Sequence, residues 1–144
     1  MLRGLDPILT PDLLYALRAM GHGDTIAIVD ANFPGESTGP NCIRLDGVDA
    51  SAALRAVLSL MPLDTFVDAP AQVMQVVGDP EAIPEAVAEF QQIINAEADM
   101  PAKIADVERF AFYDLAKASF AIVQTGERRL YGNIILTKGV VTSQ

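Results

Sequence analysis

An apolar run rich in β-branched residues, TIAIVDA, occupies residues 25–31. Its length and composition predict a strand that is buried on both faces. The run ends unusually, because Asp30 places a carboxylate at the carboxyl end of the strand, where open α/β sheets present ligand-binding groups. Asp30 is therefore a candidate binding residue. The alternative, equally compatible with the sequence, is that Asp30 caps the following loop through its backbone amides.

Helical and strand-like patterns alternate along the rest of the chain. Thr10 and Pro11 are typical of an N-cap followed by proline at the first helical position. Further helices are expected to begin at Ser51 and at Pro84, and to cover about residues 109–117. The other strand candidates are residues 65–67, 73–77, 120–124 and 131–137. This order predicts an α/β domain with a largely parallel sheet, closed at one edge by the two C-terminal strands, which would be antiparallel if their loop is a hairpin.

The length and composition indicate one domain. The chain has 144 residues, of which 51% are apolar, so a single buried core over residues 1–144 is expected. Its net charge of -9 would repel the phosphate backbone of a nucleic acid and an anionic membrane surface. Neither nucleic acid nor membrane is therefore an expected partner.

The cysteine content and the N-terminal segment predict a cytoplasmic location. The single cysteine, Cys42, allows no intrachain disulfide, which is typical of a reducing compartment. Asp6 and Pro7 interrupt the N-terminal segment, and no run of about 18 apolar residues follows. We expect neither export nor membrane insertion.

Several familiar catalytic signatures are absent from the sequence. It has neither a Gly-rich strand-to-helix loop of the dinucleotide type nor a phosphate-binding loop that ends in Lys and Ser or Thr. It has no nucleophile-elbow serine, and a single histidine cannot make a two-histidine metal site. The sequence therefore predicts a function without cofactor or metal.

His22 is the only histidine and lies in Gly21-His22-Gly23-Asp24, between the first helix and the first strand. The glycines leave its ring accessible, and imidazole exchanges protons near neutral pH. His22 is therefore a candidate acid/base group. Spacing alone favours the alternative, a helix C-cap in which His22 interacts with the last carbonyls of the helix.

Two segments with aromatic residues can bind a polyol. Residues 109–113 (RFAFY) combine the Arg109 guanidinium with aromatic surface, which can hold a sugar by hydrogen bonds and by stacking, although Phe110 and Phe112 are expected in the core. Tyr131 and Asn133 would point to the same side of the last strand, with Gly132 between them. An edge-strand pair that packs on a neighbour explains the second segment equally well.

Two carboxylates bracket the strand candidate at residues 65–67. Asp64 and Asp68 could each be an ordinary solvated turn residue, and for Asp68 this is the better interpretation.

The motifs occur in an order that resembles the fucose mutarotase branch of the ribose pyranase and fucose mutarotase (RbsD/FucU) family. The matching segments are PDLL at 11–14, GHGD at 21–24, DANFP at 30–34, RLDG at 44–47, LDT at 63–65, RFAFY at 109–113, TGE at 125–127 and YGN at 131–133. Ribose-type relatives are less similar, because they have GHTD and YAN where this chain has GHGD and YGN.

The resemblance implies a three-layer α/β subunit in a ring-shaped homo-oligomer, commonly a decamer, with each pocket between neighbouring subunits. It implies that His22 is the acid/base histidine and that Asp64 is a second acid/base or substrate-holding carboxylate. The implied sugar-binding set is Asp30, Arg109, Tyr113, Tyr131 and Asn133, with Met74 as a weaker candidate for lining the pocket.

The expected activity is that of a mutarotase, an isomerase that interconverts the α and β anomers of a free monosaccharide, with L-fucose as the expected substrate. General acid/base groups suffice for this reaction, because no electron moves between molecules. The alternatives are a non-catalytic sugar-binding or regulatory module, a structural ring-forming protein, and an isomerase of the ribose pyranase type.

Overall fold

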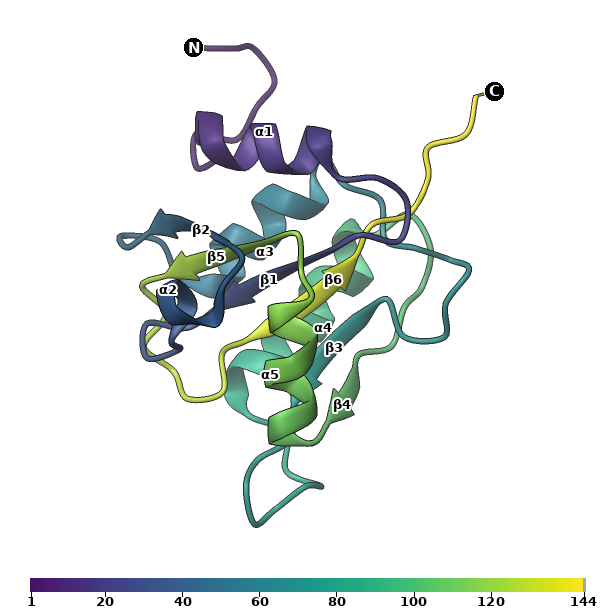
Figure 1. Cartoon of the computed structure of the whole chain (residues 1–144). Coiled ribbons are helices and arrows are strands. Elements are labelled where there is room, and N and C mark those ends of the chain that lie inside the picture. The colour runs from purple at the N-terminus through teal and green to yellow at the C-terminus, as the bar shows by residue number, and fades with distance from the viewer. Residues whose placement is uncertain (144) are drawn as a thin grey trace.

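The computed structural model describes residues 1–143 and has one mixed sheet between helices (Figure 1). The helices are α1 (Pro11–Ala19), α2 (Gly35–Thr38), α3 (Ala50–Leu58), α4 (Glu85–Glu97) and α5 (Arg109–Lys117). The strands are β1 (Thr25–Val29), β2 (Asn41–Leu45), β3 (Ala71–Met74), β4 (Ala105–Val107), β5 (Ala121–Thr125) and β6 (Ile134–Thr137).

The sheet has the strand order β2-β5-β1-β6-β3-β4. Every neighbouring pair is parallel except the two that involve β6, which runs antiparallel to β1 and to β3. The largely parallel sheet is confirmed, but the expected closure of one edge by the two C-terminal strands is wrong. β1 lies between β5 and β6, because the fully buried residues of β1 need a hydrogen-bonded neighbour on each side.

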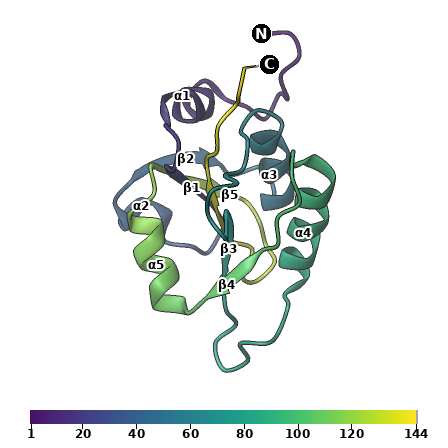
Figure 2. The ribbon, with the colours of Figure 1, turned by 90° about the vertical axis from the view of Figure 1, so that its right-hand side faces the viewer.

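The central strand divides its side chains between two apolar clusters. In β1, Ile26 and Ile28 join a large cluster with residues of α1, α3 and α4, whereas Ala27 and Val29 join a smaller cluster with α5. This alternation follows the two-residue period of a strand. Helices cover both faces of the sheet, which gives three layers (Figure 2).

The predicted N-cap of α1 agrees with the structure, whereas the N-cap of α3 lies two residues before the predicted one. The Thr10 side chain accepts a hydrogen bond from Leu13 N–H, and Pro11 follows, as predicted. The start expected at Ser51 is wrong, because the Asp49 carboxylate accepts from Ala52 N–H and begins α3 earlier. Asp and Ser are equally good caps, so the sequence alone did not separate them.

Several short elements differ from the expectation. Residues 65–67 form no strand, because Asp64 accepts from Phe66 N–H and turns the chain there. The short strands β2 and β4 and the single-turn helix α2 were missed. Phe110 is exposed, whereas Phe112 is in the core as expected. No helix within residues 1–143 is long and apolar enough to span a membrane.

Candidate active site

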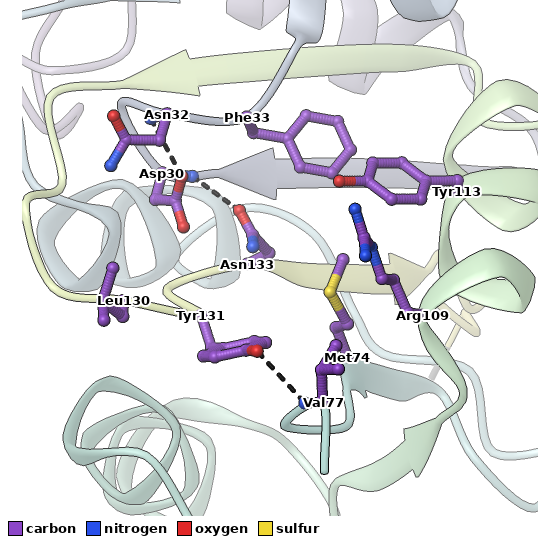
Figure 3. Close-up of a pocket in the computed structure, with 10 residues that line it drawn as sticks. All are labelled: Asp30, Asn32, Phe33, Met74, Val77, Arg109, Tyr113, Leu130, Tyr131 and Asn133. Carbon is purple, nitrogen blue, oxygen red and sulfur yellow. Dashed lines mark hydrogen bonds between the residues drawn. The ribbon is translucent and has the colours of Figure 1, made fainter.

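A pocket of about 430 Å³ opens at the carboxyl end of β1 (Figure 3). It combines hydrogen-bonding groups with aromatic and aliphatic surface, as a small-molecule site does. Its lining residues are Asp30, Asn32, Phe33, Met74, Val77, Arg109, Tyr113, Leu130, Tyr131 and Asn133. All six residues of the expected sugar-binding set therefore line one pocket.

Asp30 lines this pocket, and 6% of the residue is exposed. Its Oδ1 accepts from Asn32 N–H at 3.0 Å, and Asp30 N–H donates to Asn133 Oδ1 at 2.7 Å. Burial raises the pKa of Asp30, and hydrogen bonds from Asn32 and Phe33 N–H only partly offset that rise. Asp30 therefore caps its loop and also offers a carboxylate to the pocket, so the two interpretations left open by the sequence are compatible.

Tyr131 has an unusual backbone conformation. Among residues 1–143 it is the only non-glycine residue with positive φ, at 58°. Such strain persists only where surrounding contacts hold it, and it is common at functional sites. The Tyr131 hydroxyl accepts from Val77 N–H at 3.1 Å, which fixes the side chain at the pocket wall. Tyr131 and Asn133 precede β6, so the expected strand spacing is wrong although both line the pocket.

Aromatic residues form the opposite wall. The rings of Phe33 and Tyr113 are 5.4 Å apart, and the Arg109 guanidinium lies 6.0 Å from the Tyr113 ring centroid. In Figure 3, Arg109 and Tyr113 face the hollow from the side opposite Asp30, and Met74 lies between Arg109 and Tyr131. This wall offers guanidinium donors together with flat apolar surface, which suits a polyol with a C–H face.

His22 and Asp64 form a second group, outside this pocket. His22 Nε2 lies 3.0 Å from Asp64 Oδ1, and 45% of the His22 side chain is exposed, compared with 2% for Asp64. Burial by itself would raise the pKa of Asp64, but hydrogen bonds from Phe66 N–H and from His22 hold this pKa below its usual value. An ionised carboxylate only accepts, so Nε2 carries the proton of a neutral His22 ring and Nδ1 is the acceptor of that ring.

The two groups lie at opposite ends of β1. His22 precedes the strand and Asp30 follows it, and five strand residues span about 17 Å. A monosaccharide is shorter than this, so His22 and Asp30 of one chain cannot contact the same sugar. The structure thus brings together the binding candidates and, separately, the acid/base candidates.

A partly buried ion pair supports the loop between β5 and β6. The Glu127 carboxylate accepts from Arg129 Nε at 2.8 Å and from Ala50 N–H at 3.1 Å. Hydrogen bonds from Arg129 hold the pKa of Glu127 below its usual value despite burial. Arg129 also donates to Glu89 at 2.8 Å. No function was predicted for either residue of this pair, although Glu127 belongs to the TGE motif.

We expect Arg129→Met to lower the free energy of unfolding by about 2 kcal/mol, because it leaves the buried Glu127 carboxylate without its main partner. Urea unfolding at fixed protein concentration measures the change. The matched control is Arg55→Met, since Arg55 also faces Glu89, at 3.9 Å, but is half exposed. Its loss should stay within about 0.5 kcal/mol, and equal losses in the two variants would contradict this account.

The pocket also contains residues that the sequence did not single out for binding. These are Asn32, Phe33, Val77 and Leu130. Asn32 and Phe33 belong to the DANFP motif, so their position beside Asp30 could have predicted them as pocket residues. Val77 and Leu130 belong to no motif that would have predicted binding. Within residues 1–143, no group of three or more His, Cys, Asp or Glu side chains is placed to hold a metal ion.

Comparison with known proteins identifies the family of this chain. The model of the RbsD / FucU transport protein family matches residues 3–141. The chain belongs to this family. Two RbsD / FucU relatives named fucose mutarotase are 48% identical (Mus musculus) and 47% identical (Homo sapiens). Each alignment covers 97% of this chain, with 95% of the first relative and 94% of the second.

A solved structure extends the likeness to the backbone. It is that of the fucose mutarotase in complex with L-fucose from Streptococcus pneumoniae, which is 42% identical and has a TM-score of 0.91. The match covers 98% of this chain and 100% of that one. The α/β fold described above is therefore the RbsD / FucU fold.

Proposed function

We propose that this chain is an isomerase, a mutarotase that interconverts the α and β anomers of L-fucose. The observation that carries the proposal is the pocket at the carboxyl end of β1, in a chain 42% identical to a fucose mutarotase solved with L-fucose. The pocket offers a carboxylate, an amide and a guanidinium to hydroxyl groups, together with aromatic surface for an apolar sugar face.

The proposed sugar-binding residues have different roles, which follow from the chemistry of their side chains. Asp30 and Asn133 hold hydroxyl groups on one side of the pocket, and Arg109 donates from the opposite side. Tyr113 supplies flat surface, and Met74 fills the wall beside it. Tyr131, held in its strained conformation, places a hydroxyl that can orient the sugar or relay a proton.

Anomer exchange requires four events. The anomeric hydroxyl loses a proton, the ring oxygen gains one as its bond to the anomeric carbon breaks, the opened aldehyde rotates, and the ring closes on the other face. His22 Nδ1 is the acid/base atom in this proposal, since Nε2 is engaged by Asp64. Asp64 fixes the tautomer and stabilises the imidazolium that forms. Protons are returned at closure, so no cofactor is consumed.

Each complete site combines two chains. His22 at one end of β1 cannot reach a sugar held by Asp30 of the same chain, so a neighbour must supply the histidine. Exposed apolar side chains lie at both places: Phe66 lies against the His22 ring, and Val77, Phe110 and Leu130 lie in or beside the pocket. Contact between these unlike surfaces would cover both groups of side chains.

A contact between unlike surfaces repeats from chain to chain and closes into a ring when the rotation permits. We therefore propose a ring-shaped homo-oligomer, with a decamer as the assembly that the family resemblance implies. In this proposal residues 1–144 form one mutarotase domain, which acts in the cytoplasm on a free sugar.

We expect the purified protein to accelerate exchange between the L-fucose anomers without added metal or nucleotide, and with chelator present. Magnetisation-exchange NMR measures the rate directly, and D-ribose and D-galactose serve as comparison sugars. Binding of L-fucose without faster exchange would indicate a sugar-binding module. Exchange equal to the buffer blank for every sugar, with folded protein confirmed, would refute the enzymatic function.

A further inference from the structure

The side chain of Lys138, the residue after β6, binds the C-terminal end of α1. The half-buried Lys138 donates from Nζ to the carbonyl oxygens of Leu17 and Met20, at 2.7 Å and 2.5 Å. These carbonyls lie at the C-terminal end of α1, where backbone acceptors lack partners within the helix and a positive charge is favourable. Lys138 therefore caps α1 from a distant part of the chain.

The backbone of Lys138 holds the other end of the same loop. Its N–H donates to the Asp24 carbonyl, and its carbonyl accepts from Gly23 N–H, each at 2.9 Å. His22 lies between the residues that Lys138 contacts through its side chain and those that it contacts through its backbone. One residue thus fixes the loop on both sides of the histidine.

The neighbours of Lys138 hold the segment that carries Asp64. Asp64 N–H donates to the Thr137 carbonyl at 3.0 Å, and Gly139 N–H donates to the Pro62 carbonyl at 2.8 Å. A Cβ on Gly139 would lie 2.6 Å from the Leu63 carbonyl oxygen, so only glycine allows this approach. Residues 137–139 therefore set the separation between the His22 loop and the Asp64 segment.

We infer that Lys138 is a positioning residue for the His22–Asp64 pair and that its ammonium group keeps His22 Nε2 in hydrogen-bond contact with Asp64. The inference rests on the proposed function only in assigning proton transfer to His22. The loop needs such support, because His22 is flanked by two glycines, one of them at φ 87°, and its ring is nearly half exposed. Ordering a glycine-flanked segment costs conformational entropy that the Lys138 bonds offset.

The test compares Lys138→Met with Lys138→Arg and with the matched control Arg18→Met. Arg18 is an exposed cation in the last turn of α1, the turn that Lys138 caps. His22 is the only histidine, so ¹⁵N NMR of the imidazole at about pH 8, where free imidazole is neutral, reports this ring alone. The exchange rate at saturating L-fucose and the Tm are measured on the same samples.

We expect wild type, Arg18→Met and Lys138→Arg to show the tautomer with the proton on Nε2. Lys138→Met should show averaged tautomers and an exchange rate about 10-fold lower, because a small displacement of a catalytic group is costly. Unchanged imidazole signals in Lys138→Met, with or without a lower Tm, would overturn the inference.

The two proposals can fail separately. Averaged tautomers with an unchanged exchange rate would support positioning by Lys138 and count against proton transfer by His22. If Lys138→Met does not fold, Lys138→Gln, which keeps one N–H donor group, replaces it with the same expected signals. Wild-type imidazole signals in Lys138→Gln would then overturn the inference.

Discussion

His22→Ala is expected to lower the catalysed rate of L-fucose anomer exchange by about 10²-fold or more while the assembly and the fold stay intact. The loss is the usual scale for removing a general acid/base. The fold should survive, because His22 lies in an exposed loop and its ring hydrogen-bonds, among residues 1–143, only to Asp64. Magnetisation-exchange NMR gives the rate, and mass measurement of the native assembly verifies the subunit number.

The matched control is His22→Gln. An amide can still donate a hydrogen bond to Asp64, but it does not take up a proton near neutral pH. If His22 acts by proton transfer, Gln should be as inactive as Ala. If His22 only caps α1 or holds Asp64 in place, Gln should restore most of the rate, and the catalytic assignment would then be wrong.

The fold was largely predictable where the hydrophobic period is strong. The run at residues 25–31 predicted a fully buried strand, and β1 is buried on both faces and lies inside the sheet. α5 covers Arg109–Lys117, as predicted. The strand order was not predictable in the same way, because it depends on contacts between segments far apart in the chain. The insertion of β1 between β5 and β6 is the main example.

The weak elements were missed for a physical reason. β4 has three residues at the edge of the sheet, and its pairing with β3 rather than its own composition makes it a strand. The segment at residues 65–67 has a strand-like composition, but the Asp64 side chain competes for its backbone and forms a turn.

The candidate site was predictable residue by residue but only partly in its arrangement. The carboxylate that follows the apolar residues of β1 indicated Asp30 as a binding residue, and the YGN segment indicated Tyr131 and Asn133. The left-handed conformation of Tyr131 has no sequence signal, because tyrosine rarely adopts it. His22 and Asp30 lie at opposite ends of β1, and the strand predicted at residues 25–31 already implied this separation.

Mixing two inactive variants should restore activity if each pocket takes its parts from two chains. His22→Ala damages one end of β1, and Tyr131→Ala damages the pocket at the other end. In a randomly reassembled 1:1 mixture, about one quarter of the interfaces would join an intact His22 to an intact Tyr131 pocket. We therefore expect about a quarter of the wild-type rate, from two proteins that are each nearly inactive.

The control mixture pairs His22→Ala with Asp64→Ala. These residues contact each other within one chain, so no interface in that mixture would contain a complete pair. It should stay inactive whichever way the chains assemble. His22→Ala alone, taken through the same dissociation and reassembly, corrects for any change in rate caused by the treatment.

The exchange rate of L-fucose anomers in the reassembled His22→Ala and Tyr131→Ala mixture is therefore the decisive measurement. The two-chain pocket predicts a rate of about one quarter of wild type in mixed oligomers verified by mass, beside an inactive His22→Ala and Asp64→Ala mixture. Verified mixed oligomers that stay as inactive as the control would contradict the two-chain pocket.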